Sequence, residues 1–136
     1  MLGKAYAGKR EFDRGITLLE AVMDFYGKST KRRDMAQFAD AAGTLGTIYQ
    51  RMKQHDKALE LLRRAVEIET RLGIRGSIGF RYANIGNVLR DKGDRPGACR
   101  NWQQAEQAFT RIGATPLIRR VQESQRLNNC NTMSKT

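Results

Sequence analysis

Proline, histidine and cysteine are all scarce in this sequence, and each shortage narrows what the chain can be. Only 2 prolines among 136 residues leave long segments in which helices can form without interruption. The single histidine, His55, falls in a predicted exposed turn, and no Cys-His spacing suggests a metal site. A phosphate-cradling glycine loop is also missing. We therefore predict a protein that is not an enzyme, with no catalytic residues, metal or cofactor.

Long apolar runs and export signals are missing as well. No segment reaches the roughly 20 apolar residues that a membrane-spanning helix needs, and residues 1–10 lack the apolar centre of a secretory signal. These absences predict a cytoplasmic protein without a membrane partner. In that compartment the two cysteines, Cys99 and Cys130, are expected to be reduced thiols.

Acidic residues are outnumbered 14 to 25 by lysine and arginine, which gives a net charge of +11. Such a balance favours encounter with anionic partners. Basic residues gather in Lys28–Arg33 and in Arg111–Thr136, so a nucleic-acid-binding protein is an alternative. We rank it second, because no nucleic-acid motif accompanies the charge and basic side chains on helices usually form a solvated surface.

What the sequence does contain is an internal repeat of 40 residues. The segment Leu45–Tyr49 recurs as Ile85–Leu89. At the same shift Ala58 corresponds to Ala98, Leu62 to Trp102, Ala65 to Ala105, and Leu72-Gly73 to Ile112-Gly113. A fixed period of this kind predicts a stack of similar units.

A weaker copy of the unit lies 43 residues upstream. Leu2-Gly3 and Tyr6 match Leu45-Gly46 and Tyr49, while Gly15, Leu19 and Val22 take the places of Ala58, Leu62 and Ala65. The sequence thus predicts three repeats, at about residues 1–30, 35–73 and 76–113, the first of them cut short.

Within a unit the apolar spacing is helical. Ala58, Leu62 and Ala65 belong to one apolar stripe that only Glu69 interrupts. Gly46 and Gly86 remove side-chain bulk where two helices of a pair must approach, and we expect Leu62 and Trp102 to fill the space beside them. Asp56 and Asp94 are candidate N-caps, Pro96 suits a first helical turn, and Gly73 and Gly113 suit left-handed C-caps.

These signals predict an all-α chain. We expect helices at about 1–9, 13–28, 33–53, 56–72, 77–92 and 95–112, and a capping helix at 116–128. They would form a single domain over residues 1–128, a right-handed superhelical stack of antiparallel helix pairs. Residues 129–136 are expected to be a flexible tail.

The pattern Ala42-x-x-Leu45-Gly46-x-x-Tyr49, followed by Ala58-x-x-x-Leu62-x-x-Ala65, resembles the tetratricopeptide repeat family. The longer period resembles the subgroup of kinesin light chain, the Pins-type adaptors and the repeat arms of bacterial regulators. That resemblance implies that the first helices of the pairs line a concave groove for a peptide. Arg81-Tyr82-Ala83-Asn84-Ile85-Gly86-Asn87 reproduces the motif that contacts the peptide there.

The resemblance implies a partner-binding groove, for which we select six candidate residues. They are Arg81, Asn84, Asn87, Arg90, Thr47 and Gln50. An arginine can clamp a carboxylate and an asparagine can pair with a peptide backbone. The competing interpretation is that an asparagine amide caps or bridges neighbouring helices.

The function predicted from this resemblance is a scaffold that binds a protein or peptide, with an acidic ligand among the candidates. We expect the chain to be part of a larger regulatory protein, because Met1 falls partway into the first predicted helix. A homodimer through this open N-terminal end is an alternative.

Overall fold

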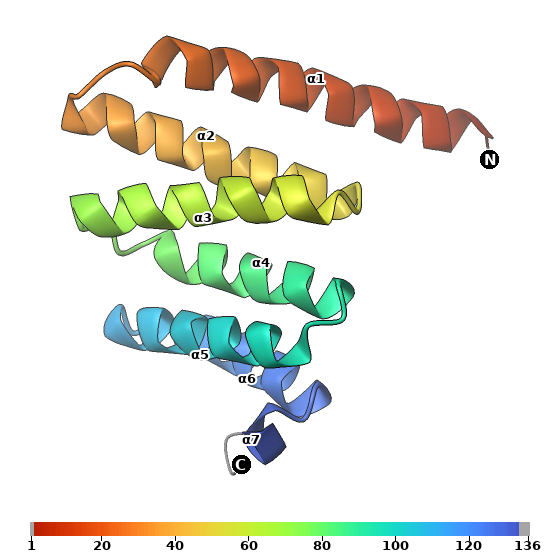
Figure 1. Cartoon of the computed structure of the whole chain (residues 1–136), viewed down its shortest axis with the longest axis vertical. Helices are drawn as coiled ribbons and strands as arrows, with labels where there is room; N and C mark the ends of the chain where they lie inside the picture. Colours follow the sequence, from red (N-terminus) through yellow and green to blue (C-terminus); the bar gives the residue numbers. More distant parts are fainter. Residues whose placement is uncertain (1, 134–136) are drawn as a thin grey trace.

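A computed structural model describes the backbone of residues 2–133 and the side chains of Lys9 and of residues 11–131. This part of the chain is a stack of helices with no strand (Figure 1). The helices are α1 (Leu2–Tyr26), α2 (Arg32–Arg51), α3 (His55–Leu72), α4 (Ile78–Asp91), α5 (Arg95–Arg111), α6 (Thr115–Leu127) and α7 (Cys130–Met133). None of them is long and apolar enough to cross a bilayer, as far as the described residues go.

The predicted all-α helical repeat stack is confirmed. From α2 to α6 every predicted helix is present, with ends within two residues of the expected positions. The pairs α2/α3 and α4/α5 are antiparallel hairpins joined by short turns (Figure 1). The handedness of the superhelix stays a prediction.

The glycines in the first helix of each pair allow the close contact that the sequence predicts. A Cβ atom on Gly46 would come within 2.8 Å of Leu62 Cγ, and one on Gly86 within 2.5 Å of Trp102 Nε1. Leu62 and Trp102 are fully buried, or nearly so, at 0% and 1% exposure. In each hairpin, therefore, one large side chain of the second helix packs directly against the glycine backbone of the first helix.

The helix caps follow the predictions at four positions and depart from them at one. Asp94 Oδ1 accepts a hydrogen bond from Gly97 N at 2.9 Å, and Pro96 lies in the first turn of α5. Gly73 and Gly113 adopt the left-handed conformation, with φ of 70° and 67°. The N-cap prediction for Asp56 is wrong, because α3 begins two residues earlier than such a cap requires.

Asp56 lies within α3 and pairs instead with Lys92, its Oδ1 2.7 Å from Lys92 Nζ. The earlier start also places His55 at the first position of α3. There it is half-buried rather than in the exposed turn that we expected.

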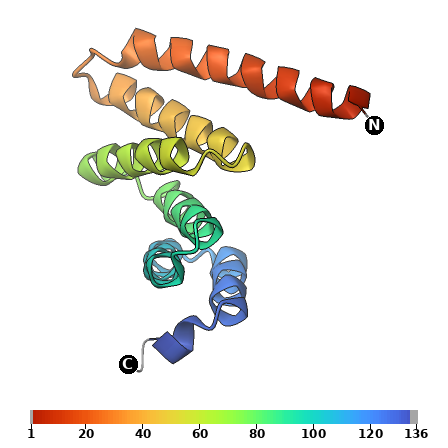
Figure 2. The same ribbon diagram turned by 45° about the vertical axis from the view of Figure 1, so that its right-hand side comes forward.

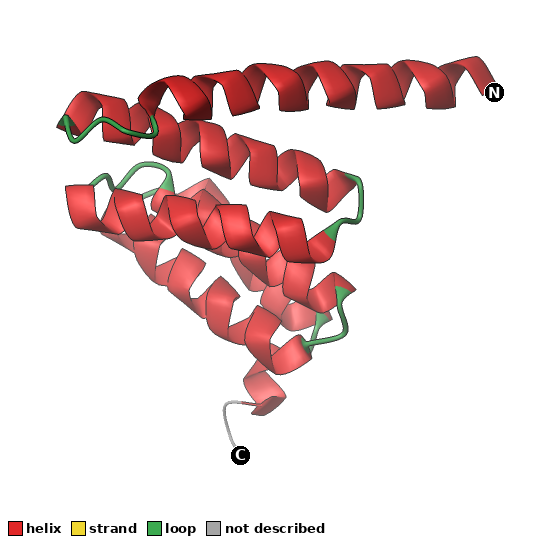
Figure 3. Cartoon of the chain, turned by 45° about the horizontal axis from the view of Figure 1, so that its top comes forward, coloured by secondary structure: helices red, strands yellow, loops and turns green. Residues whose placement is uncertain are grey.

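The first predicted hairpin is absent. Residues 2–26 form one continuous helix, where we expected helices at 1–9 and 13–28. The connecting segment Lys9-Arg10-Glu11-Phe12 has neither glycine nor proline, and the helix therefore continues through it. As a result the N-terminal part of α1 extends past the end of α2 instead of folding back (Figures 1 and 3).

The C-terminal segment also differs from prediction. Cys130 is buried at the start of α7 and forms a disulfide with Cys99 of α5, with the two Cα atoms 5.4 Å apart. The prediction of reduced thiols is therefore wrong, and the start of the expected flexible tail is helical; residues 134–136 lie outside the described part. The turn after α6 returns the chain toward α5 (Figure 2), which sequence spacing does not reveal.

Candidate partner-binding groove

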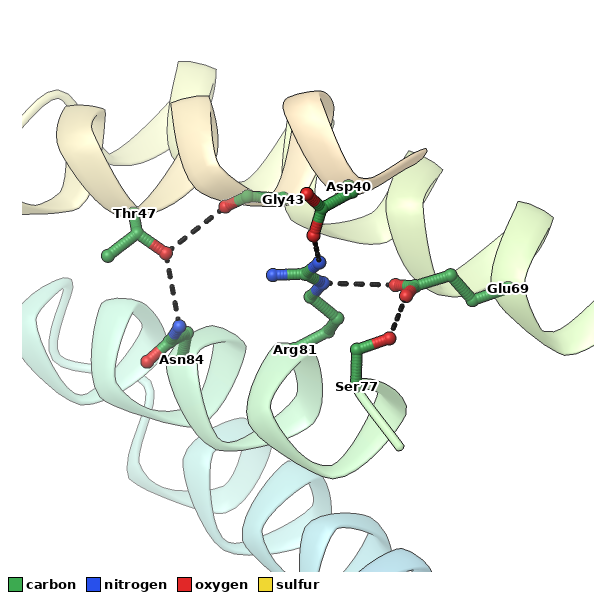
Figure 4. A network of polar contacts seen from close by, with 7 residues as sticks. All are labelled: Asp40, Gly43, Thr47, Glu69, Ser77, Arg81 and Asn84. Carbon is green, nitrogen blue, oxygen red and sulfur yellow. Dashed lines mark hydrogen bonds and ion pairs between the residues drawn. The ribbon is translucent and has the colours of Figure 1, made fainter. Parts of the chain in front are cut away.

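Arg81, one of the predicted ligand contacts, lies at a junction of three helices. It projects from α4 between α2 and α3 and is only 7% exposed (Figure 4). Its Nε donates to Glu69 Oε1 at 3.0 Å, and one NH2 group donates to Asp40 Oδ1 at 3.1 Å. Buried ions require such compensation, because desolvation of an unpaired charge costs several kcal/mol.

The neighbouring residues are fitted to this guanidinium. Glu69, the one polar residue in the apolar stripe of α3, is 2% exposed and also accepts a hydrogen bond from Ser77 Oγ. A Cβ atom on Gly43 would come within 2.3 Å of Arg81 Cζ, so the guanidinium lies directly against the α2 backbone. Arg81 is thus held by contacts within the chain, and little of its surface is open to a partner.

Thr47 and Asn84 continue the same polar network toward the groove. Asn84 Nδ2 donates to Thr47 Oγ1 at 3.1 Å, and Thr47 Oγ1 donates to the carbonyl oxygen of Gly43 at 3.1 Å (Figure 4). The asparagine amide thus bridges α4 to α2, which is the competing interpretation of this residue. Both side chains remain half-buried rather than enclosed.

Of the three remaining candidates, Asn87 lines a cleft beside α4, whereas Arg90 and Gln50 do not. Asn87 Oδ1 accepts a hydrogen bond from Trp102 Nε1 at 3.2 Å, which orients the amide. Arg90 is exposed and pairs with its neighbour Asp91, with 3.1 Å between its NH2 group and Oδ1. Gln50 is half-buried near the end of α2.

A cleft of about 190 Å³ lies between α4, α5 and α6 and contains the two asparagines. Its apolar lining includes Phe80, Trp102 and Phe109, and the rings of Phe80 and Phe109 meet edge to face with centroids 5.2 Å apart. Its polar lining consists of Asn84, Asn87, Arg120 and Ser124. The cleft thus combines aromatic side chains with a few polar groups that could orient a ligand.

Arg120 is the single charged residue in the lining of this cleft, and the sequence did not single it out as a site. It is exposed on α6, and its guanidinium has no ion pair within the described residues. The polar face of the predicted capping helix could have indicated a binding residue there. However, that face contains both Arg119 and Arg120, and the sequence alone does not show which of the two lines the cleft.

A larger hollow of about 410 Å³ lies beside the disulfide, on another side of α5. It is bordered by polar side chains, and Glu106 in its wall already accepts hydrogen bonds from Gln122 and Gln125 at 3.1 and 2.9 Å. We favour the smaller cleft as the binding site, because it joins the predicted asparagines to an arginine without an ion partner.

Comparison with known families identifies the repeat unit. Residues 38–75, from Phe38 in α2 through the end of α3, match the tetratricopeptide repeat family. This segment is therefore a tetratricopeptide repeat, a fold of protein-interaction modules. A comparison with curated proteins found no match.

Proposed function

We propose that this chain is a scaffold that binds a segment of another protein in the cleft between α4 and α6. The observation that carries the proposal is the convergence of Asn87 and Arg120 on an aromatic-lined hollow. Asn87 has its Oδ1 occupied by Trp102, so its Nδ2 hydrogens are available to a peptide carbonyl. Arg120 supplies the positive charge that we had assigned to Arg81.

This geometry defines the ligand by its chemistry. An apolar side chain of the partner would enter the cleft over Trp102 and Phe109, and a nearby carboxylate would meet Arg120. An acidic segment also suits the net charge of +11. The proposed site retains Asn84 and Asn87 from the predicted set, with Thr47 as a support for Asn84.

Selection from a random peptide display library tests the proposal. We expect enriched peptides that combine an aspartate or glutamate with a large apolar residue, and we expect Arg120→Glu to abolish their binding. Arg119→Glu is the matched control, since it changes the charge equally at the adjacent exposed position outside the cleft. Peptides that bind Arg120→Glu as well as wild type, or a library that yields none, would refute the proposal.

The wider setting of this scaffold is also a proposal. We retain membership in a larger regulatory protein as a prediction, while the cytoplasmic location that the sequence predicts remains to be tested. The Cys99–Cys130 disulfide weighs against a reducing cytoplasm, because disulfides persist mainly in oxidising compartments. A basic-surface nucleic-acid binder is the alternative outcome, and it would show as salt-dependent RNA or DNA binding that is indifferent to Arg120.

A further inference from the structure

The outer face of α1 has apolar residues that nothing in the described part of the chain covers. Leu18 is 68% exposed and Phe25 is 79% exposed, two helical turns apart on the same face. By the 43-residue correspondence between repeats they occupy the positions of Leu61 and Ile68 in α3. Those two residues are half-buried, so the same repeat position is covered in α3 and open in α1.

In the second repeat, α2 contributes to the cover of Leu61, the residue that corresponds to Leu18. Within the described residues, the first repeat has no equivalent helix packed on Leu18. Leu61 lines a shallow cleft together with Leu45 and Tyr49 of α2, and α1 borders the same cleft on its other side. The upstream equivalents of Leu45 and Tyr49 are Leu2 and Tyr6. Residues 2–9 thus carry the sequence of the covering helix, but they continue α1 in a straight line (Figure 3). A segment of the same straight helix cannot fold back over Leu18.

We propose that a second copy of this chain supplies the cover by exchange of residues 2–9. In this dimer the N-terminal part of each α1 lies antiparallel on the middle of the other α1. Each contact is made twice about a two-fold axis, as in most homodimers. The exchange covers the first repeat of both copies with a segment that the sequence already matches to it.

The register of the exchange follows from the second repeat. There Gly46 faces Leu62, and the same relationship shifted by 43 residues sets Gly3 of one copy opposite Leu19 of the other. An antiparallel pairing in this register also places Lys9 opposite Asp13 of the other copy. Both are exposed in the single chain, and their opposite charges favour the arrangement.

Light scattering coupled to size-exclusion chromatography tests the dimer, over protein concentrations from micromolar to millimolar. We expect twice the chain mass for the wild type. Leu18→Asp should weaken association by more than about a hundredfold, since two buried leucines are lost per dimer. Phe25→Asp and Leu127→Asp should leave the mass unchanged, because Phe25 lies beyond the covered segment and Leu127, 66% exposed, lies on α6.

A hinge variant separates exchange from simple adhesion of two apolar faces. Arg10→Gly/Glu11→Gly gives α1 a flexible point at which residues 2–9 can fold back onto their own chain, so we expect a monomer of nearly unchanged helicity by circular dichroism. A monomeric wild type, a hinge variant that remains dimeric, or dissociation by Phe25→Asp equal to that by Leu18→Asp would each overturn the proposal. The peptide cleft lies between α4 and α6, so this result is independent of the proposed function.

Discussion

Arg81 and Glu69 form a buried ion pair, with 3.0 Å between Nε and Oε1 and side-chain exposures of 9% and 3%. The pair connects the second repeat to the third. Glu69 lies in the last turn of α3, the second helix of one hairpin, and Arg81 lies in α4, the first helix of the next. Asp40 of α2 adds a second acceptor from a more exposed position. A residue that the family resemblance assigns to ligand contact is thereby committed to the packing of consecutive repeats.

Removal of either partner of this pair should destabilise the protein strongly. We expect Arg81→Ala or Glu69→Ala to lower the free energy of unfolding by about 3–5 kcal/mol, because each leaves a buried charge without its buried ionic partner. Urea unfolding followed by circular dichroism measures the change.

The exposed pair Arg71–Glu67, at 3.3 Å in one helix, provides the control for the buried pair. Arg71→Ala should cost less than about 0.5 kcal/mol. The double variant Glu69→Leu/Arg81→Met should recover most of the lost stability, since apolar side chains often replace a buried ion pair without loss. Equal effects of Arg81→Ala and Arg71→Ala would contradict the structural role of Arg81.

Gly86→Ala should disturb the packing of α4 on α5. A Cβ at this position would overlap the indole of Trp102, which is almost fully buried. We expect a loss of about 1–3 kcal/mol in the free energy of unfolding, measured by thermal or urea denaturation. Gly76→Ala is the control, since nothing lies within 4 Å of its added Cβ. A tolerated Gly86→Ala would mean that the helices are not in such close contact.

Lys53→Gly should stabilise the turn between α2 and α3. Lys53 has a φ of 60°, and the equivalent residue in the next repeat, Gly93, has a φ of 89°. A side chain in the left-handed region costs roughly 1 kcal/mol, and glycine avoids this cost. We therefore expect a gain of about 0.5–1 kcal/mol by urea unfolding, whereas Lys57→Gly, inside α3, should cost about 1 kcal/mol. A loss of stability in Lys53→Gly would contradict the turn geometry.

Reduction of the Cys99–Cys130 disulfide should lower stability by about 3–4 kcal/mol, the loop-entropy value for a separation of 31 residues. Urea unfolding with and without reductant measures this difference. The purified protein should show no thiol that reacts with Ellman's reagent under non-reducing denaturing conditions. Two reactive thiols per chain would contradict the disulfide. Cys99→Ser and Cys130→Ser should each reproduce the stability of the reduced protein.

The exposed pair between Asp56 and Lys92 predicts a local pH response. The hydrogen bond and charge of Lys92 hold the pKa of the Asp56 carboxyl below its ordinary value. A depressed pKa in the folded state means that the contact stabilises the protein above the ordinary aspartate pKa and is lost as the pH falls through the folded-state pKa. Lys92→Met should return the pKa of Asp56 toward its ordinary value in an NMR titration, while Lys57→Met should not. An unchanged Asp56 titration in Lys92→Met would contradict the pair.

The parts of the fold that the sequence predicts are those in which local signals agree with packing. Gly46 and Gly86 predict the close helix pairs, and Asp94, Gly73 and Gly113 predict helix ends, because each acts on its immediate neighbours. The hairpin predicted within residues 1–28 is wrong because the local sequence and the repeat pattern disagree there. The repeat pattern predicts a hairpin there, but a turn needs residues that interrupt a helix, and Lys9–Phe12 contains none.

The candidate site was predicted less completely, for a related reason. Glu69 interrupts the apolar stripe of α3, but the sequence does not reveal its partner, Arg81, which lies 12 residues away on another helix. Asn84 and Asn87 were found through the family motif, whereas Arg120 depends on how α6 is rotated against α4. The disulfide likewise depends on the return of α7 toward α5.

The central claim, that a partner segment binds between α4 and α6, is tested most directly by amide chemical-shift mapping with a peptide obtained from the display selection. The account predicts the largest shifts within Phe80–Asn87 and Leu117–Ser124, with loss of those shifts in Arg120→Glu and their retention in Arg119→Glu. Shifts confined to α1, to α3 or to the hollow beside the disulfide, with the α4 and α6 signals unmoved, would contradict it.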